Sequence, residues 1–262
     1  MIYGVPDTAD WADLERELDA WGGDGQVATL WWRDDDAVRL TPALDRLLER
    51  AAGTPLSLAL IPGGLIAEEA EALATRLRRE PAASALQHGW MHTNHAAPGA
   101  KKTELGDERP AAAILSELAA GWQHLSALFG ALALPVLTPP WNRIAAALVP
   151  RLRNAGLRGL SAAGPRASRE PSPGLVQVNT HADLVAWTGD RGFIGAPLAL
   201  GRIVGHLRAR RTEAADRAEP TGILTHHLVQ DAATETFLKR LLAATARHGA
   251  ARWVGAAEAF AP

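Results

Sequence analysis

The sequence predicts an α/β fold, a deformed (β/α) barrel with about seven parallel strands. Short apolar runs alternate along the chain with longer runs that carry apolar residues on one helical face. The short runs are apolar throughout, as expected for parallel strands that helices cover on the outside. No glycine-rich phosphate loop follows the first strand, so an open dinucleotide-binding sheet is not supported. A closed or partly closed barrel therefore fits the pattern best.

The expected strands are apolar runs that end in a polar or turn residue. They cover residues 27–32, 56–61, 85–87, 135–137, 157–161, 175–179, 223–228 and 251–254. The expected helices are amphipathic, the first with Thr8 as its N-cap and the second with Pro42 in its first turn. They cover residues 9–21, 41–52, 67–79, 111–129, 144–154, 198–211 and 232–248.

The length of 262 residues allows one large hydrophobic core. We therefore expect a single domain over residues 1–262, in which residues 1–24 form an N-terminal helical extension. Residues 162–174 are rich in Pro, Ser and Ala and are expected to form a loop rather than a domain boundary.

Composition and charge exclude several classes of function. The net charge of −2 gives no field that would attract nucleic acid or an anionic membrane. The absence of cysteine excludes disulfides, cysteine-bound zinc and a cysteine nucleophile. Residues 1–24 lack the basic and apolar regions of a signal peptide, and no apolar run is long enough to span a membrane. A cytoplasmic protein is expected, with a homodimer as the commonest oligomer.

Polar clusters follow five of the expected strands. In parallel barrels the carboxyl ends of the strands meet at one rim, where catalytic residues lie. The sequence therefore predicts that the clusters converge on one rim. The clusters are residues 33–36, 87–95, 138–143, 179–183 and 225–227.

The first cluster contains Asp34, Asp35 and Asp36. Adjacent carboxylates repel one another unless a cation or a proton relieves the repulsion. A solvated turn that caps the next helix is one interpretation. The position directly after a buried strand favours another, in which one carboxylate binds a metal and a second acts as a base.

The second cluster contains His88, His92 and His95, three of the nine histidines. The spacing of four residues places His88 and His92 on one face of a helix or tight loop. Two imidazoles and one carboxylate suit Zn²⁺ or a similar ion. Ordinary core or surface histidines are the alternative.

Two further clusters have a chemical interpretation. His226 and His227 offer a candidate acid, and a strand-end imidazole bonded to a loop carbonyl is the alternative interpretation. Pro139 and Pro140 lack backbone N–H groups, so the Trp141 N–H is the first free donor of a stiff segment. Such a donor suits an oxyanion, while a rigid turn before a helix would look the same.

The ordered motifs resemble those of the polysaccharide deacetylases, the NodB-homology carbohydrate esterases. The resemblance spans about residues 27 to 231 and implies a NodB-like barrel. It rests on the sequences Asp35-Asp36-Ala37, His88-x-x-x-His92, Thr138-Pro139-Pro140-Trp141-Asn142, which matches in part, and Leu224-Thr225-His226.

The chain departs from the family at two positions. Thr138 stands where the family has an arginine that orients the base, and residues 156–161 lack the acidic residue of the fourth motif. The loss of both residues together suggests that other side chains support the catalytic groups in this chain. Arg33 or Arg143 could supply the missing cation, and Asp183 could orient His226 or His227.

The resemblance implies a role for each matched residue. Asp35 is the expected base, His226 the acid and the Trp141 N–H the oxyanion donor. One divalent ion, expected to be Zn²⁺, is held by Asp36, His88 and His92. The run of three aspartates leaves Asp34 as an alternative carboxylate, and His227 is an alternative acid. Candidate substrate contacts are Trp90, His95, Arg143, His181, Asp183 and His227, with Trp187 and Arg191 also considered.

The expected activity is that of a metal-dependent hydrolase acting on non-peptide carbon–nitrogen amide bonds. It would remove an acetyl or other acyl group from an N-acylated amino sugar or a related small amide. One alternative is a metal-dependent sugar lyase or isomerase, which would need no leaving-group acid. A second is a non-catalytic carbohydrate-binding or regulatory protein, which would not need base, metal ligands and acid together.

Overall fold

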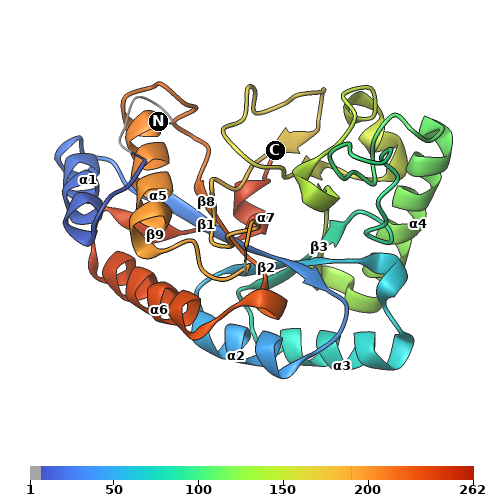
Figure 1. Cartoon of the computed structure of the whole chain (residues 1–262), viewed down its shortest axis with the longest axis horizontal. Helices are drawn as coiled ribbons and strands as arrows, with labels where there is room; N and C mark the ends of the chain where they lie inside the picture. Colours follow the sequence, from blue (N-terminus) through green and yellow to red (C-terminus); the bar gives the residue numbers. More distant parts are fainter. Residues whose placement is uncertain (1–6, 190) are drawn as a thin grey trace.

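A curved sheet of parallel strands with helices packed on its outside forms the centre of the molecule (Figure 1). The computed structural model describes residues 7–189 and 191–262. The first six residues of the expected N-terminal extension lie outside that part. The strand order is β6-β5-β4-β3-β2-β1-β8-β7, and β9 pairs with the start of β1. The predicted α/β barrel class is confirmed.

The strands of the sheet differ greatly in length. They are β1 (Ala28–Ala37), β2 (Leu56–Leu60), β3 (Ala83–His88), β4 (Ala133–Thr138), β5 (Gly159–Leu160), β6 (Val176–Gln177), β7 (Ala182–Asp183), β8 (Thr221–Thr225) and β9 (Ala251–Trp253). The α-helices are α1 (Trp11–Gly23), α2 (Pro42–Ala51), α3 (Ala67–Leu77), α4 (Ala111–Phe129), α5 (Ala196–Arg211), α6 (Ala232–Arg247) and α7 (Ala256–Ala259).

One irregular segment joins the two ends of the sheet. The Val178 and Thr180 amides donate to carbonyls of residues 160 and 162, on the β5 side. The His181 and Leu184 amides donate to carbonyls of residues 222 and 224, in β8. Residues 176–184 thus pair with both neighbours in turn, which is the deformation that the family resemblance implied.

Side chains on the two faces of β1 have different surroundings. Trp31 packs among apolar residues near α7 and donates its Nε1–H to the Asn179 carbonyl at 2.9 Å. Arg33 and Asp35 follow on the same face, because alternate residues of a strand share a face. Trp32 points to the other face and joins the main core beneath the helices. The strand therefore carries an apolar layer first and charged groups toward its carboxyl end.

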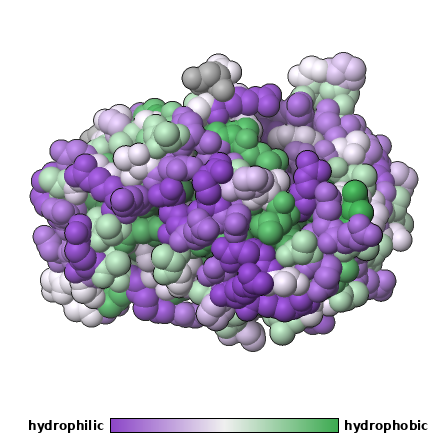
Figure 2. All heavy atoms as spheres, turned by 90° about the horizontal axis from the view of Figure 1, so that it is seen from below, coloured by the Kyte–Doolittle hydropathy of each residue, from purple (hydrophilic) through white to green (hydrophobic). Residues whose placement is uncertain are grey.

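The helices cover the outer face of the sheet. Helices α2, α3 and α6 lie along the lower side in Figure 1, and α1 packs beside α5. Pro42 lies in the first turn of α2, as predicted, and Thr41 is the N-cap. Hydrophilic side chains cover most of the face drawn in Figure 2, with hydrophobic ones in scattered groups. Among the described residues, no helix combines the length and apolarity needed to cross a membrane.

Several expected elements are corrected by the structure. Residues 144–154 do not form an α-helix: a 3₁₀ segment, η4 (Val149–Ala155), occupies the end of that range, and Pro150 lacks the N–H that an α-helix needs there. Asp10, rather than Thr8, caps α1 through a reciprocal box with Asp13. The first strand runs on through the three aspartates, and β7 was not expected.

Candidate active site

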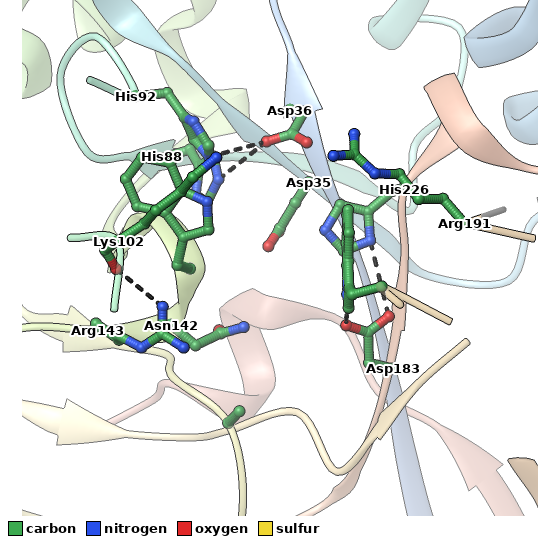
Figure 3. Close-up of a pocket in the computed structure, with 13 residues that line it drawn as sticks. Asp35, Asp36, His88, His92, Lys102, Asn142, Arg143, Asp183, Arg191 and His226 are labelled. Atoms are coloured by element: carbon green, nitrogen blue, oxygen red, sulfur yellow. Dashed lines mark hydrogen bonds and ion pairs between the residues drawn. The ribbon is translucent and has the colours of Figure 1, made fainter. Parts of the chain in front are cut away.

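A cavity of about 740 Å³ opens at the carboxyl ends of the strands (Figure 3). Each of the five predicted polar clusters contributes at least one lining residue, and the convergence follows from the parallel sheet. Its lining residues are Asp35, Asp36, His88, His92, Lys102, Trp141, Asn142, Arg143, Ala163, Asp183, Trp187, Arg191 and His226.

Asp35 and Asp36 both line the cavity although neighbouring strand residues normally face opposite ways. The register of β1 against β2 shifts between Asp34 and Ala37, and Asp36 adopts a φ of 76°. This local irregularity breaks the alternation. As a result, two adjacent carboxylates reach one cavity while Asp34 points elsewhere.

Asp36, His88 and His92 bring three ligand atoms together. Asp36 Oδ1 lies 3.2 Å from His88 Nε2 and 3.4 Å from His92 Nε2. This buried oxygen has no aligned hydrogen-bond partner within the described chain. Two imidazoles and a carboxylate are a three-ligand set found at catalytic zinc sites. The donor set therefore fits a divalent ion.

Burial and the neighbouring charges shift the pKa values of the three residues in this cluster. Burial opposes ionisation of Asp36, but the facing His88 imidazole, with His226 and His92, holds the pKa of Asp36 well below its usual value. Burial also opposes protonation of His88, but the Asp35 and Asp36 carboxylates outweigh it and raise the pKa of His88. Burial and the neighbouring His88 lower the pKa of His92.

Thr138 orients His88. His88 Nδ1 lies 2.9 Å from the Thr138 carbonyl oxygen and 3.0 Å from Thr138 Oγ1. The Thr138 hydroxyl also donates to the Gln87 carbonyl at 3.1 Å. A proton on Nδ1 that is given to a carbonyl leaves the Nε2 lone pair facing Asp36, the arrangement that metal-binding histidines use. Thr138 thus supports His88 within the candidate metal-ligand set, a role that the sequence did not indicate.

The loop that carries His92 is held by Glu104, which lies in a polar stretch of the sequence. Glu104 is buried, and its carboxylate accepts the backbone N–H groups of residues 90, 91 and 93 at 3.0, 2.7 and 3.3 Å. Gly89 has a φ of +59°, and a Cβ there would lie 2.0 Å from Glu104 Oε2. Only glycine permits this close packing beside the ligands.

Arg33 holds Asp35 in a bidentate ion pair. Its Nε lies 2.8 Å from Asp35 Oδ1, and its Nη2 donates to Asp35 Oδ2 at 2.9 Å. The remaining donors reach Ser161 Oγ at 2.7 Å and Asn142 Oδ1 at 2.7 Å. Arg33, rather than Arg143, is therefore the cation that contacts Asp35. Ser161 lies where the acidic residue of the fourth motif is absent.

Asp34 and His227 form a separate buried pair that does not line the cavity. His227 Nδ1 lies 2.5 Å from Asp34 Oδ1, and Thr225 Oγ1 donates to Asp34 Oδ2 at 2.7 Å. Burial opposes protonation of His227, but the Asp34 carboxylate outweighs it and raises the pKa of His227. Geometry therefore favours Asp35 and Asp36 over Asp34, and His226 over His227, as the groups that meet a ligand.

His226 faces the metal cluster from the opposite wall (Figure 3). Its Nδ1 lies 3.9 Å from Asp183 Oδ1, within ion-pair range. The Trp187 ring packs edge-on against the imidazole at a centroid distance of 4.7 Å. Trp187 Nε1 donates to Asp183 Oδ2 at 2.6 Å, so the carboxylate holds the indole that packs against the imidazole.

Trp141 forms part of the wall next to His92, with ring centroids 4.3 Å apart. Its φ of 55° is in the left-handed region, which costs energy for a bulky residue. A 3₁₀ turn, η3 (Pro140–Asn142), thus places Trp141 at the wall of the cavity.

Of the candidate substrate contacts, Arg143 and Asp183 line the cavity, while Trp90, His95, His181 and His227 do not. His95 instead contacts Arg109, with Nε2 and Nη1 3.2 Å apart. Trp187 and Arg191 do line it.

His181 belongs to a second cluster with His206 and Glu219 that has ligand atoms at metal-like separations. His181 Nε2 lies 3.4 Å from Glu219 Oε2. However, the Gly222 amide donates to His181 Nδ1 at 2.9 Å, which places the imidazole proton on Nε2. A protonated Nε2 faces Glu219 and offers no lone pair to a metal. We therefore interpret this cluster as a buried hydrogen-bonded support.

The structure is similar to carbohydrate esterases of family 4. It matches an acetyl xylan esterase of Clostridium thermocellum solved with a cobalt ion (TM-score 0.54, 15% identity, 88% of this chain and 90% of that one). It also matches the peptidoglycan N-acetylglucosamine deacetylase Bc1960 (0.52, 15%, 92% and 95%). A third match is the Bacillus anthracis pseudoenzyme BA3943 (0.55, 12%, 90% and 66%).

No protein-family model matches the sequence, and no curated protein matches it. At identities of 12–15% the structural matches establish the fold. The predicted resemblance to the polysaccharide deacetylases is confirmed at the level of the fold.

Proposed function

We propose that this chain is a metal-dependent hydrolase that removes an acetyl or other acyl group from an N-acylated amino sugar or a related non-peptide amide. The observation that carries the proposal is the arrangement across one cavity. Asp36, His88 and His92 gather on one wall, with Asp35 beside them and His226 opposite. The similarity in fold to deacetylases supports the same chemistry.

Asp36, His88 and His92 would hold the divalent ion, with Zn²⁺ as the expected metal. When bound, such an ion lowers the pKa of water and polarises a carbonyl oxygen. The residues of the chain supply the rest. Asp35, fixed by Arg33, would take the proton of the attacking water. The Trp141 N–H would donate to the oxyanion that forms on the acyl carbon.

His226 would complete the reaction by protonating the leaving nitrogen. An amine leaves poorly without a proton, so amide hydrolysis needs a placed acid. His226 lines the cavity and has an exposed fraction of 7%, so it is shielded yet reachable by substrate. Asp183 and Trp187 would hold its ring in position.

The pair of substrates acetanilide and 4-nitrophenyl acetate tests this assignment. Nitrophenolate leaves without a proton, whereas aniline does not. We expect His226→Ala to lower kcat/KM for acetanilide by about 100-fold or more and for the nitrophenyl ester by far less. His227→Ala is the matched control from the neighbouring position. Equal losses on both substrates would argue against His226 as the acid, and no hydrolysis of either by metal-loaded wild type would contradict the proposed activity.

A non-catalytic function is the second candidate. It is favoured by the loss of two family motif residues and by the similarity to a pseudoenzyme. The bidentate Arg33–Asp35 pair weighs against it, because the support lost at residue 138 is replaced at residue 33.

A further inference from the structure

We propose that the substrate of this cavity carries an anionic group, a carboxylate or a phosphate, close to its acylated nitrogen, and that Arg191 binds it. This inference deepens the proposed function and rests on it for the reaction. Its evidence is a group of positively charged side chains that line the cavity and have no role in the proposed reaction.

Three cationic side chains line the cavity: Lys102, Arg143 and Arg191. Within the described residues, none of the three lies within ion-pair distance of a carboxylate, and Arg143 contacts only the Lys102 carbonyl, at 2.9 Å. Several other arginines form ion pairs, such as Arg76 and Arg252. Cations that share a pocket without counter-ions repel one another, so a ligand anion would be favourable.

The carboxylates of the cavity do not balance these cations. Asp35 is neutralised by Arg33, and Asp36 would be balanced by the divalent ion. Asp183 accepts hydrogen bonds from the Trp187 indole and the Val185 amide and lies near His226. With the metal bound, the cavity therefore has a net positive charge, which favours an anionic substrate over a neutral one.

Arg191 is placed by its backbone as well as by its charge. It lies on a hairpin whose base is closed by the Val185–Phe193 bridge and by a hydrogen bond from the Phe193 amide to Asp231. In Figure 3 its side chain extends into the cavity from the His226 side, with Arg143 on the opposite side.

The φ of Arg191 is 60°, a conformation that favours glycine. Seven non-glycine residues among those described have a positive φ, and five of them line this cavity: Asp36, His92, Trp141, Asn142 and Arg191. Strained backbone tends to collect at functional sites. Arg191 thus shares its unusual conformation with the metal and oxyanion groups.

Calorimetry on the metal-loaded protein tests the inference with three probes: N-acetylglucosamine, its 6-phosphate, and N-acetylmuramic acid, which carries a carboxylate. We expect one or both anionic probes to bind at least about tenfold more tightly than the neutral sugar. The arm that shows the gain identifies phosphate or carboxylate as the preferred group. Higher ionic strength should reduce the gain, because salt screens exposed charges.

Arg191→Gln should abolish most of that gain, and Arg143→Gln should reduce it less. Arg151→Gln removes the same charge from an exposed position on η4 outside the cavity and should leave it unchanged. Equal binding of all three probes, no binding of any, or equal effects of Arg191→Gln and Arg151→Gln would overturn the inference. Arg191-dependent binding without release of acetate would instead contradict the proposed hydrolase while the anion site stands.

Discussion

Arg33 and Asp35 occupy alternate positions of one strand, and their side chains meet in a bidentate ion pair at 2.8 and 2.9 Å. Both are almost completely buried. The cation that orients the expected base thus comes from the same strand as the base, two residues earlier. Residue 138 is a threonine, and its Oγ1 lies 3.0 Å from His88 Nδ1 instead of contacting Asp35.

Removing the Arg33 charge should damage both activity and stability. Arg33→Met would leave the buried Asp35 without a partner, and breaking a buried pair costs about 3–5 kcal/mol. We expect kcat to fall by about 100-fold or more. Urea unfolding and steady-state kinetics measure the two effects.

Arg33→Lys provides the graded control for that experiment. Lysine keeps the charge but cannot form the forked contact, so its kcat should lie between those of wild type and Arg33→Met. A fully active Arg33→Met variant would show that Asp35 needs no positioning and is not the base.

The Thr138 hydroxyl should tune metal affinity rather than chemistry. Thr138→Val keeps the shape and the backbone carbonyl that faces His88 but removes Oγ1. Loss of such a supporting contact typically weakens metal binding about 10- to 100-fold. We expect a weaker metal Kd with a kcat near that of wild type at saturating metal. An unchanged Kd would mean that the carbonyl alone orients His88.

Two glycines with positive φ allow a matched test of the loop that carries His92. Gly89 and Gly99 have φ values of +59° and +83°, but only at Gly89 would a Cβ meet close neighbours. Gly99→Ala should cost about 1–2 kcal/mol of unfolding free energy. Gly89→Ala should cost more and should also weaken metal binding, because Glu104 must move. Equal effects of both would contradict the role given to Glu104.

The buried Asp34–His227 pair predicts a pH-dependent contribution to stability. Because the pKa of His227 is raised in the folded state, its contribution is fully present below about pH 6.5 and is lost as the pH rises through the folded-state pKa. In metal-free protein, His227→Gln should lower the unfolding free energy by about 3 kcal/mol at pH 6 and by less at pH 9. A difference that does not vary with pH would contradict this assignment.

Most of the architecture was predictable because parallel strands and the helices that cover them require apolar residues at regular spacings in the sequence. The convergence of the aspartates, histidines and Trp141 followed from the same pattern. Contacts between residues that are distant in the chain produce no such pattern in the sequence. The Glu104 carboxylate, for example, reads as a charge in a polar loop, although it accepts three backbone N–H groups.

The roles of neighbouring residues depended on local backbone irregularity. Strict alternation along β1 would place Asp34 and Asp36 on one face, and only the positive φ of Asp36 brings it beside Asp35. The charge of Arg33 was visible in the sequence, but its burial between Asp35 and Ser161 was not. His181 was grouped with the active site by its position after a strand, yet it points to Glu219.

The metal content of purified protein tests the central claim most directly. Elemental analysis of chelator-free preparations should find about one equivalent of Zn²⁺ or a similar ion per chain, lost in His88→Ala and retained in His206→Ala. The second variant matters because His206 belongs to the other histidine cluster. Metal that is lost from His206→Ala but retained in His88→Ala, or no metal in wild type even after dialysis against zinc, would contradict the proposed site.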